Sequence, residues 1–209
     1  MEQNNEIKVW DILIRIFHWS LVIAFFIAYF SGEEENIWHI YAGYTVLGLI
    51  SFRVIWGFIG TKHARFSDFI YSPQTVFQYL KGLVMKHPKH YLGHNPAGGC
   101  MVILLLASLF VVTVSGLKVY AIEEGKGPLA DSSEIVLISE SYASAGEYEY
   151  EEKEEQEDEE EFWEEIHEGA TNFTLALIFL HIIGVIASSK LHKENLIKAM
   201  ITGKKKINE

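Results

Sequence analysis

Four histidines lie inside long apolar stretches of this 209-residue chain, where an ionisable side chain is costly to place. They are His18, His39, His167 and His181. A single histidine in such a position is usually satisfied by a hydrogen bond to a carbonyl oxygen, but four of them favour a chemical role. Because neutral imidazole is the commonest metal ligand in proteins, metal binding is the leading hypothesis.

The spacing sorts these histidines into two layers. His167 and His181 are 14 residues apart. At 3.6 residues per turn this is about 3.9 turns, so both rings leave one helix face, roughly 21 Å apart along the axis. Counted from the ends of the apolar stretches, His18 is expected at the same depth in the membrane as His181, and His39 at the same depth as His167. We therefore expect an inner pair, His18 with His181, and an outer pair, His39 with His167.

Paired imidazoles without further protein ligands suit a haem iron, because the porphyrin supplies the other four nitrogens. Zinc sites usually add a third and a fourth protein ligand, and a carboxylate di-iron site needs several glutamates within the bundle. Glu168 is the only acid close to these histidines within an apolar stretch. The lone Cys100 excludes a disulfide scaffold, a Cys-ligated zinc site and an iron–sulfur cluster, and no C-x-x-C-H motif for covalent haem attachment is present.

The residues around the histidines agree with a bound macrocycle. Gly43, Ala170 and Gly184 follow a histidine by three or four residues and share its helix face, which leaves room for a flat ring. Arg15 and Arg53 fall in the inner layer, where we expect them to pair with haem propionates. The alternative for Arg15 is that it extends to the membrane interface.

The remaining histidines divide into two groups. We expect His63, His87 and His90 to be solvated loop residues. His94 and His192 each flank an apolar stretch, so their roles stay open.

The apolar stretches themselves must position these side chains. They run over about 12–32, 37–60, 97–120 and 163–189. Since twenty helical residues cover the ~30 Å hydrocarbon core of a bilayer, each stretch predicts a transmembrane helix. Buried helices of a soluble protein are the alternative, which four such stretches in one short chain make improbable. We expect an all-α integral membrane four-helix bundle, with residues 1–209 forming a single domain.

The distribution of charge predicts the orientation. Lys and Arg gather in the N-terminal segment, between the second and third stretches, and in a basic tail over 190–209, so both termini should be cytoplasmic. Segment 121–161 is then an acidic periplasmic loop. Half of the 28 acidic residues lie between Glu147 and Glu168, which predicts either a solvated tether or a docking surface for a basic partner. The net charge of −11 gives no support to nucleic-acid binding.

The chain resembles a known family, the bacterial cytochrome b561 family, which includes the b-type cytochrome subunits of membrane-bound nickel–iron hydrogenases. The resemblance covers roughly residues 8–120 and 160–206. It is carried by RIFHW (15–19), HIYAGY (39–44), FRVIWGFIG (52–60), HARFSDF (63–69), GHNPAGG (93–99) and the segment 164–206, which begins EEIHEGATNF.

The resemblance implies two b haems held between four helices. Carried over residue by residue, His18 and His181 would hold the haem on the cytoplasmic side, and His39 and His167 would hold the periplasmic one. It also implies a membrane quinone as a diffusible substrate. We therefore expect a respiratory electron conduit in the bacterial inner membrane, between the quinone pool and a periplasmic redox partner such as a c-type cytochrome.

Three alternatives stay open. The chain could be the membrane-anchor cytochrome subunit of a hydrogenase-like complex, or a stand-alone superoxide:quinone oxidoreductase. From a different class, it could be a non-redox structural or transport membrane protein. No nucleophile–base pair for substrate cleavage is visible in the sequence.

A quinone site is expected where the third stretch begins. Asn95 can both donate to and accept from a quinone oxygen, and His94 beside it can relay a proton. Pro96 starts the helix, so the alternative is that Asn95 only caps the helix N-terminus.

Overall fold

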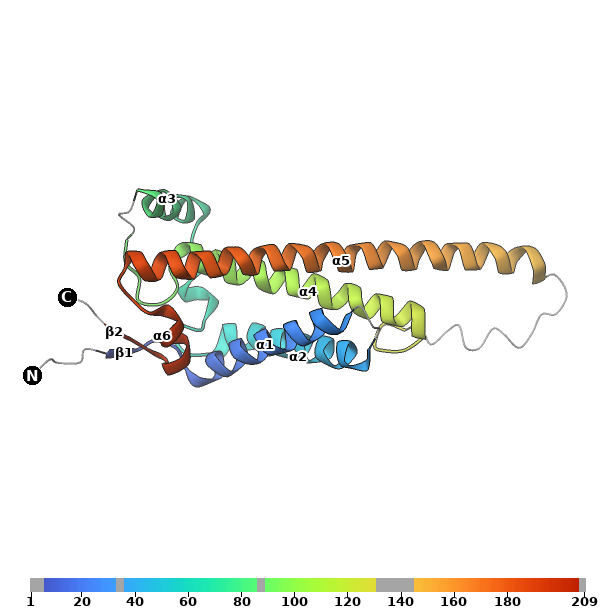
Figure 1. Ribbon diagram of the computed structural model, residues 1–209, viewed down its shortest axis with the longest axis horizontal. Coiled ribbons are helices and arrows are strands. Elements are labelled where there is room, and N and C mark those ends of the chain that lie inside the picture. The colour runs from blue at the N-terminus through green and yellow to red at the C-terminus, as the bar shows by residue number, and fades with distance from the viewer. Residues whose placement is uncertain (1–5, 33–35, 86–88, 131–144, 207–209) are drawn as a thin grey trace, which may run out of the picture. The chain divides into compact units, whose positions relative to one another are not determined.

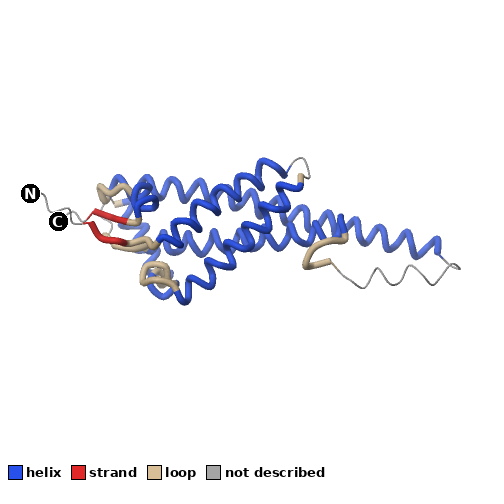
Figure 2. The backbone as a smooth tube through the Cα atoms, turned by 90° about the horizontal axis from the view of Figure 1, so that it is seen from below, coloured by secondary structure: helices blue, strands red, loops and turns tan. Residues whose placement is uncertain are grey.

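The computed structural model describes residues 6–32, 36–85, 89–130 and 145–206; in the last range the side chains are described over 156–205. Most of these residues are helical (Figures 1 and 2). The elements are β1 (Glu6–Lys8), α1 (Ile12–Ser31), α2 (Ile37–Ile59), the 3-10 turn η2 (Phe66–Asp68), α3 (Pro73–Val84), α4 (Pro96–Glu124), α5 (Ala145–Leu191), α6 (Leu196–Thr202) and β2 (Lys204–Lys206).

Four helices are long and apolar enough to cross a membrane. They are α1, α2, α4 and the part of α5 from Gln156 to Leu191. Many large apolar side chains on them point outward, among them Phe30, which is 76% exposed, and Phe58, which is 71% exposed. Outward-facing apolar side chains are expected of helices surrounded by lipid. The prediction of a helical chain with four helices long and apolar enough to cross a membrane is confirmed.

The chain divides into two compact units, which are described separately. Unit 1 comprises residues 1–107 and 174–209, and unit 2 comprises residues 108–173. Unit 1 therefore holds α1, α2, α3, α6, both strands, the start of α4 and the end of α5. Unit 2 holds the rest of α4 and α5.

In unit 1, α1 and α2 lie side by side (Figure 1). The side chain of Asp11 caps α1 by accepting a hydrogen bond from the Ile14 amide at 2.9 Å. It also accepts from Thr61 Oγ1 at 2.6 Å and from Trp56 Nε1 at 3.3 Å. Burial raises the pKa of Asp11, but these hydrogen bonds outweigh it and hold the pKa below its ordinary value. One carboxylate thus joins the start of α1 to the end of α2.

A small antiparallel sheet joins the two ends of the chain in unit 1. β1 pairs with β2 in the register Glu6↔Lys206. The amides of Val9 and Trp10 donate to the Gly203 carbonyl at 2.8 and 3.1 Å. Gly203 has φ of 80°, a left-handed conformation that favours glycine. We call β1, β2 and Gly203 the terminal clasp.

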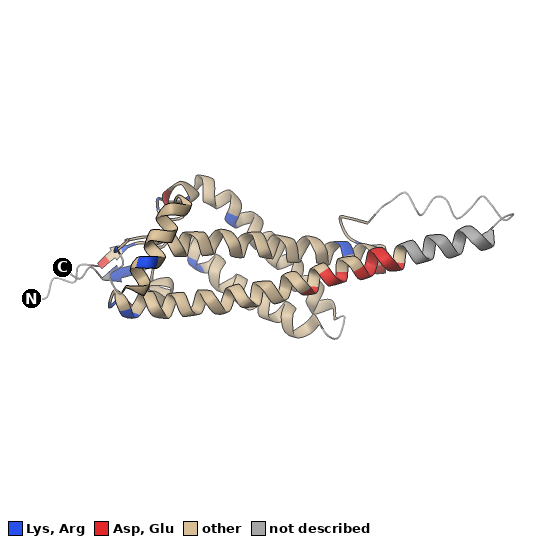
Figure 3. Ribbon diagram, turned by 90° about the horizontal axis from the view of Figure 1, so that it is seen from above, with Lys and Arg blue, Asp and Glu red and all other residues tan. Residues whose placement is uncertain are grey.

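Unit 2 differs from the expected loop over 121–161. α4 continues to Glu124, and the acidic run belongs to α5, which begins at Ala145. Glutamate is a good helix former, so an acidic run that leads into an apolar helix can extend it. In Figure 3 the acidic residues are coloured red along the described part of α5 that precedes its apolar half. Residues 131–144 lie outside the described residues.

Candidate haem-ligating histidines

The inner pair comes together within unit 1. The rings of His18 on α1 and His181 on α5 have centroids 6.5 Å apart and planes inclined by 50°. One metal ion held by two imidazoles at the usual metal–nitrogen distance of ~2.0–2.1 Å would place the centroids roughly 6.3 Å apart. Nδ1 of His18 is buried and has no hydrogen-bond partner among the described residues. The pair would therefore fit as the two protein ligands of one haem iron.

Two glycines on α2 and α5 have free space beside them. A Cβ added at Gly43 on α2 or at Gly184 on α5 would meet no described atom within 4 Å. No described side chain fills the room that a flat macrocycle needs at these two glycines.

The two arginines of the inner layer differ in their surroundings. Arg53 is 3% exposed, and its guanidinium lies 5.1 Å from the ring centroid of Phe66 and 5.6 Å from that of Phe69. Its Nη1 has no hydrogen-bond partner in the described part of the chain, which is costly for a buried charge and fits an anionic partner such as a propionate. Arg15 instead donates from Nη1 to the carbonyl of Ile201 on α6.

The members of the outer pair are held by backbone carbonyls, each within its own unit. In unit 1, Nδ1 of His39 lies 2.9 Å from the Ala28 carbonyl oxygen. In unit 2, Nδ1 of His167 lies 2.9 Å from the Val112 carbonyl oxygen and 3.2 Å from Ser115 Oγ. Since a carbonyl oxygen only accepts, Nδ1 carries the proton and Nε2 carries the lone pair. Such a bond orients the ring and selects the tautomer in most metal-ligating histidines.

Sequence reasoning did not single out Gly116 on α4. A Cβ at this position would lie 2.8 Å from the His167 ring, so only glycine leaves the ring in place. The small residues considered from sequence were those on the ligand's own helix, whereas Gly116 belongs to the neighbouring one.

Asn95 is placed as a helix cap. Its Oδ1 accepts from the Gly98 amide at 2.7 Å, at the start of α4. Its Nδ2 lies 3.5 Å from Ser188 Oγ on α5, a long contact. The cap therefore uses the amide oxygen and makes little use of the amide nitrogen as a donor.

His94 packs between two aromatic rings, with centroid distances of 4.6 Å to both Trp10 and Phe69. Burial, together with the positive charges of Arg53 and Lys205, lowers the pKa of His94 to about 3. This histidine is therefore neutral at pH 7.

Two of the three expected loop histidines can be located. His63 is half-buried, and burial lowers its pKa. His90 is exposed, pairs with Glu194 at 2.7 Å and lies with its ring 5.2 Å from that of His192. His87 lies outside the described residues.

Comparisons with known proteins show the family of the chain. The family model described as prokaryotic cytochrome b561 matches residues 9–203. A "Probable Ni/Fe-hydrogenase B-type cytochrome subunit" of Azotobacter chroococcum mcd 1 is 27% identical over 162 residues, which cover 63% of this chain and 66% of that protein. A protein of the same name from Rhodobacter capsulatus is 24% identical over 163 residues, covering 63% and 62%.

A third relative of that name, from Rhizobium leguminosarum bv. viciae, is 22% identical over 233 residues. This alignment covers 97% of this chain and 90% of the relative. The chain thus spans just under two thirds of the length of the first two relatives. No solved structure gives a significant match. Because the family model covers nearly the whole chain, and the paired histidines lie within the matched segment, this chain belongs to the prokaryotic cytochrome b561 family.

Proposed function

We propose that this chain is a di-haem b-type cytochrome that carries electrons across the bacterial inner membrane between the quinone pool and a redox partner on the opposite side. Family membership and the names of the relatives already indicate a membrane cytochrome b that carries electrons. The observation that carries the proposal is the inner pair, in which two spanning helices present His18 and His181 with ring centroids 6.5 Å apart.

We assign a separate set of residues to each of the two haems. His18 and His181 hold one haem, and Arg53, with its unpartnered Nη1, neutralises a propionate. For the second haem, the 14-residue spacing on α5 and the family resemblance support His39 and His167. A bound b haem supplies one-electron chemistry, while the protein supplies ligation, a fixed ring orientation and a low-dielectric surrounding.

The quinone site is proposed beside the inner pair, at the start of α4. Nδ2 of Asn95 is the donor for a quinone oxygen, because Oδ1 is engaged in the helix cap. His94 lies next to Asn95 in the chain, but with a pKa of about 3 it is a poor proton acceptor at pH 7, so it is not proposed as the proton relay. The excess of Lys and Arg on this side supports a cytoplasmic location.

The direct test is haem content. Purified protein should hold two low-spin b haems per chain by pyridine haemochrome assay. His181→Ala should lose one of them, whereas the matched loop variant His63→Ala should keep both. One haem in the wild type, or full loading of the His181 variant, would contradict the proposal.

The names of the relatives favour a second candidate, the membrane-anchor cytochrome subunit of a hydrogenase-like complex. Mild-detergent purification from the native membrane distinguishes the two. A large metal-containing subunit that copurifies in a fixed ratio supports the anchor role, and recovery of the cytochrome alone supports a separate electron carrier.

A further inference from the structure

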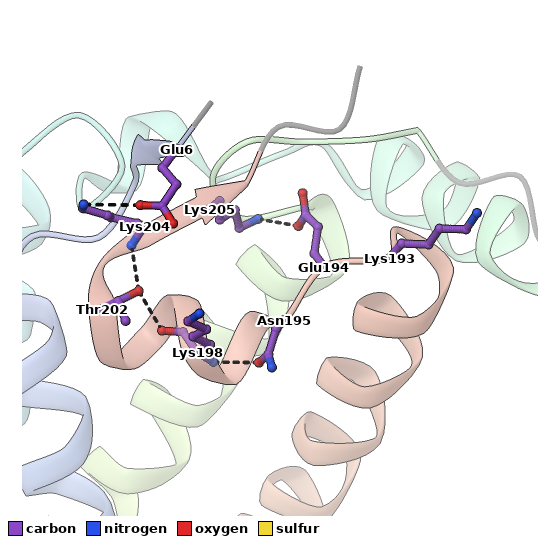
Figure 4. Close-up of a pocket in the computed structure, with 8 residues that line it drawn as sticks. All are labelled: Glu6, Lys193, Glu194, Asn195, Lys198, Thr202, Lys204 and Lys205. Atoms are coloured by element: carbon purple, nitrogen blue, oxygen red, sulfur yellow. Dashed lines mark hydrogen bonds and ion pairs between the residues drawn. The ribbon is translucent and has the colours of Figure 1, made fainter. Parts of the chain in front are cut away.

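A pocket of about 480 Å³ lies beside α6 in unit 1. Figure 4 shows residues of the turn after α5, of α6 and of the terminal clasp around it. Its charged lining consists of Lys193, Lys198, Lys204, Lys205, Glu6 and Glu194. Four cations against two anions give this pocket a positive excess.

The two anions are already paired. Glu194 lies 3.2 Å from Lys205 Nζ in an ion pair whose side chains are 9% and 6% exposed, and it also accepts from His90. Glu6 lies 3.3 Å from Lys204 Nζ. Lys193 and Lys198 form no ion pair with any described residue. The uncompensated positive charge of the pocket therefore resides on these two side chains.

The backbone holds these lysines at the end of the spanning helices. α5 ends at Leu191, and Lys193 follows in a turn with φ of 53°, a left-handed conformation that is uncommon for a residue other than glycine. Arg15, in the first turn of α1, donates to the Ile201 carbonyl of α6. α6 and the pocket beside it therefore lie at the ends of α1 and α5, which is where a bilayer around these helices would place its headgroups.

The helix next to the pocket also has an uncovered apolar face. Ile197 and Ile201 of α6 are four residues apart, on one face, and are 55% and 58% exposed. An exposed apolar face beside lysines, at the end of spanning helices, is typical of a segment that lies in the membrane interface.

We propose that this pocket binds the phosphate headgroup of an anionic phospholipid, with Lys193 and Lys198 contacting the phosphate and Ile197 and Ile201 contacting the first part of the acyl chains. Free phosphate shares the charge but has no apolar part, so the two isoleucines favour a lipid. None of the residues that line this pocket is a proposed haem ligand.

The test uses the full chain, loaded with haem, in nanodiscs of phosphatidylcholine with or without phosphatidylglycerol. Native mass spectrometry should show retained phosphatidylglycerol in preference to phosphatidylcholine, and the melting temperature should rise with phosphatidylglycerol. Near a membrane surface each lysine contributes ~1 kcal/mol, so the double variant K193Q/K198Q should bind phosphatidylglycerol roughly 10- to 30-fold more weakly.

Matched variants separate the outcomes. K62Q/K81Q removes the same charge from exposed lysines elsewhere in unit 1 and should leave lipid retention unchanged. I197S/I201S should also lose phosphatidylglycerol. Equal retention of both lipids, equal loss in K62Q/K81Q, or equal stabilisation by millimolar inorganic phosphate would overturn the proposal. Haem spectra report the cytochrome function separately, so failure of one proposal is distinguishable from failure of the other.

Discussion

His167 donates its Nδ1 proton to the carbonyl oxygen of Val112, one turn before Gly116 on the neighbouring helix, at 2.9 Å. The glycine leaves room for the ring, and the carbonyl sets its tautomer. The position of the His167 ring thus depends on Gly116, which is not itself a proposed ligand. Substitution of this glycine measures the dependence.

Replacing Gly116 by Val should displace the His167 ring, because a Cβ would lie 2.8 Å from it. Haem content should fall from two per chain to one, as measured by pyridine haemochrome assay. The control is Gly48→Ala on α2, where a Cβ meets no described atom within 4 Å and both haems should remain. Two haems in a folded Gly116→Val protein would remove His167 as a ligand.

If Arg53 neutralises a propionate of the proposed inner haem, it should raise the midpoint potential of that haem, since a buried cation stabilises the reduced form. Arg53→Gln should lower that potential by tens of millivolts, the equivalent of about 1 kcal/mol for a one-electron couple. A spectroelectrochemical titration measures the change. Arg65→Gln is the control, because Arg65 is exposed and pairs with Asp68 at 3.3 Å. Equal shifts in both variants would show that the effect is not local.

The cap and the donor functions of Asn95 can be separated. Asn95→Ala removes the cap and should destabilise the protein by about 1 kcal/mol, whereas Asn95→Asp retains a capping oxygen and loses the Nδ2 donor. If Nδ2 binds quinone, both variants should slow haem reduction by quinol in stopped-flow experiments. Wild-type rates in Asn95→Asp, with lower thermal stability only in Asn95→Ala, would leave Asn95 as a cap alone.

Stability should fall on mild acidification through His94. Its pKa is about 3 in the folded chain, whereas an ordinary histidine has a pKa of 6.5, so between these pH values the unfolded chain binds a proton that the folded chain does not. At pH 5 the resulting loss is up to about 2 kcal/mol. Arg53, Lys205 and His63 all oppose protonation of this ring.

The variant His94→Phe should therefore lose less stability than the wild type between pH 7 and pH 5. Thermal melts in detergent at a series of pH values measure the difference between the two proteins. Parallel curves would show that His94 takes up its proton with an ordinary pKa.

Much of the spanning architecture could be predicted from sequence, because length and apolar composition act locally. The pairing of His18 with His181 could be inferred from their equal expected depth in the membrane. The packing of His94 between Trp10 and Phe69 could not be foreseen, since it brings together three distant segments. The helical start of α5 was missed because the acidic run was interpreted through its charge, which favours solvation, rather than through the helix propensity of glutamate.

The terminal clasp also constrains biosynthesis. β1 leaves the ribosome first, but its partner β2 follows about 200 residues later, so at 5–20 residues per second β1 stays unpaired for roughly 10 to 40 s. By then all four spanning helices have been translated. Closure of the sheet is consequently a late event in maturation, and a chain that stops before Gly203 leaves the amides of Val9 and Trp10 without this acceptor.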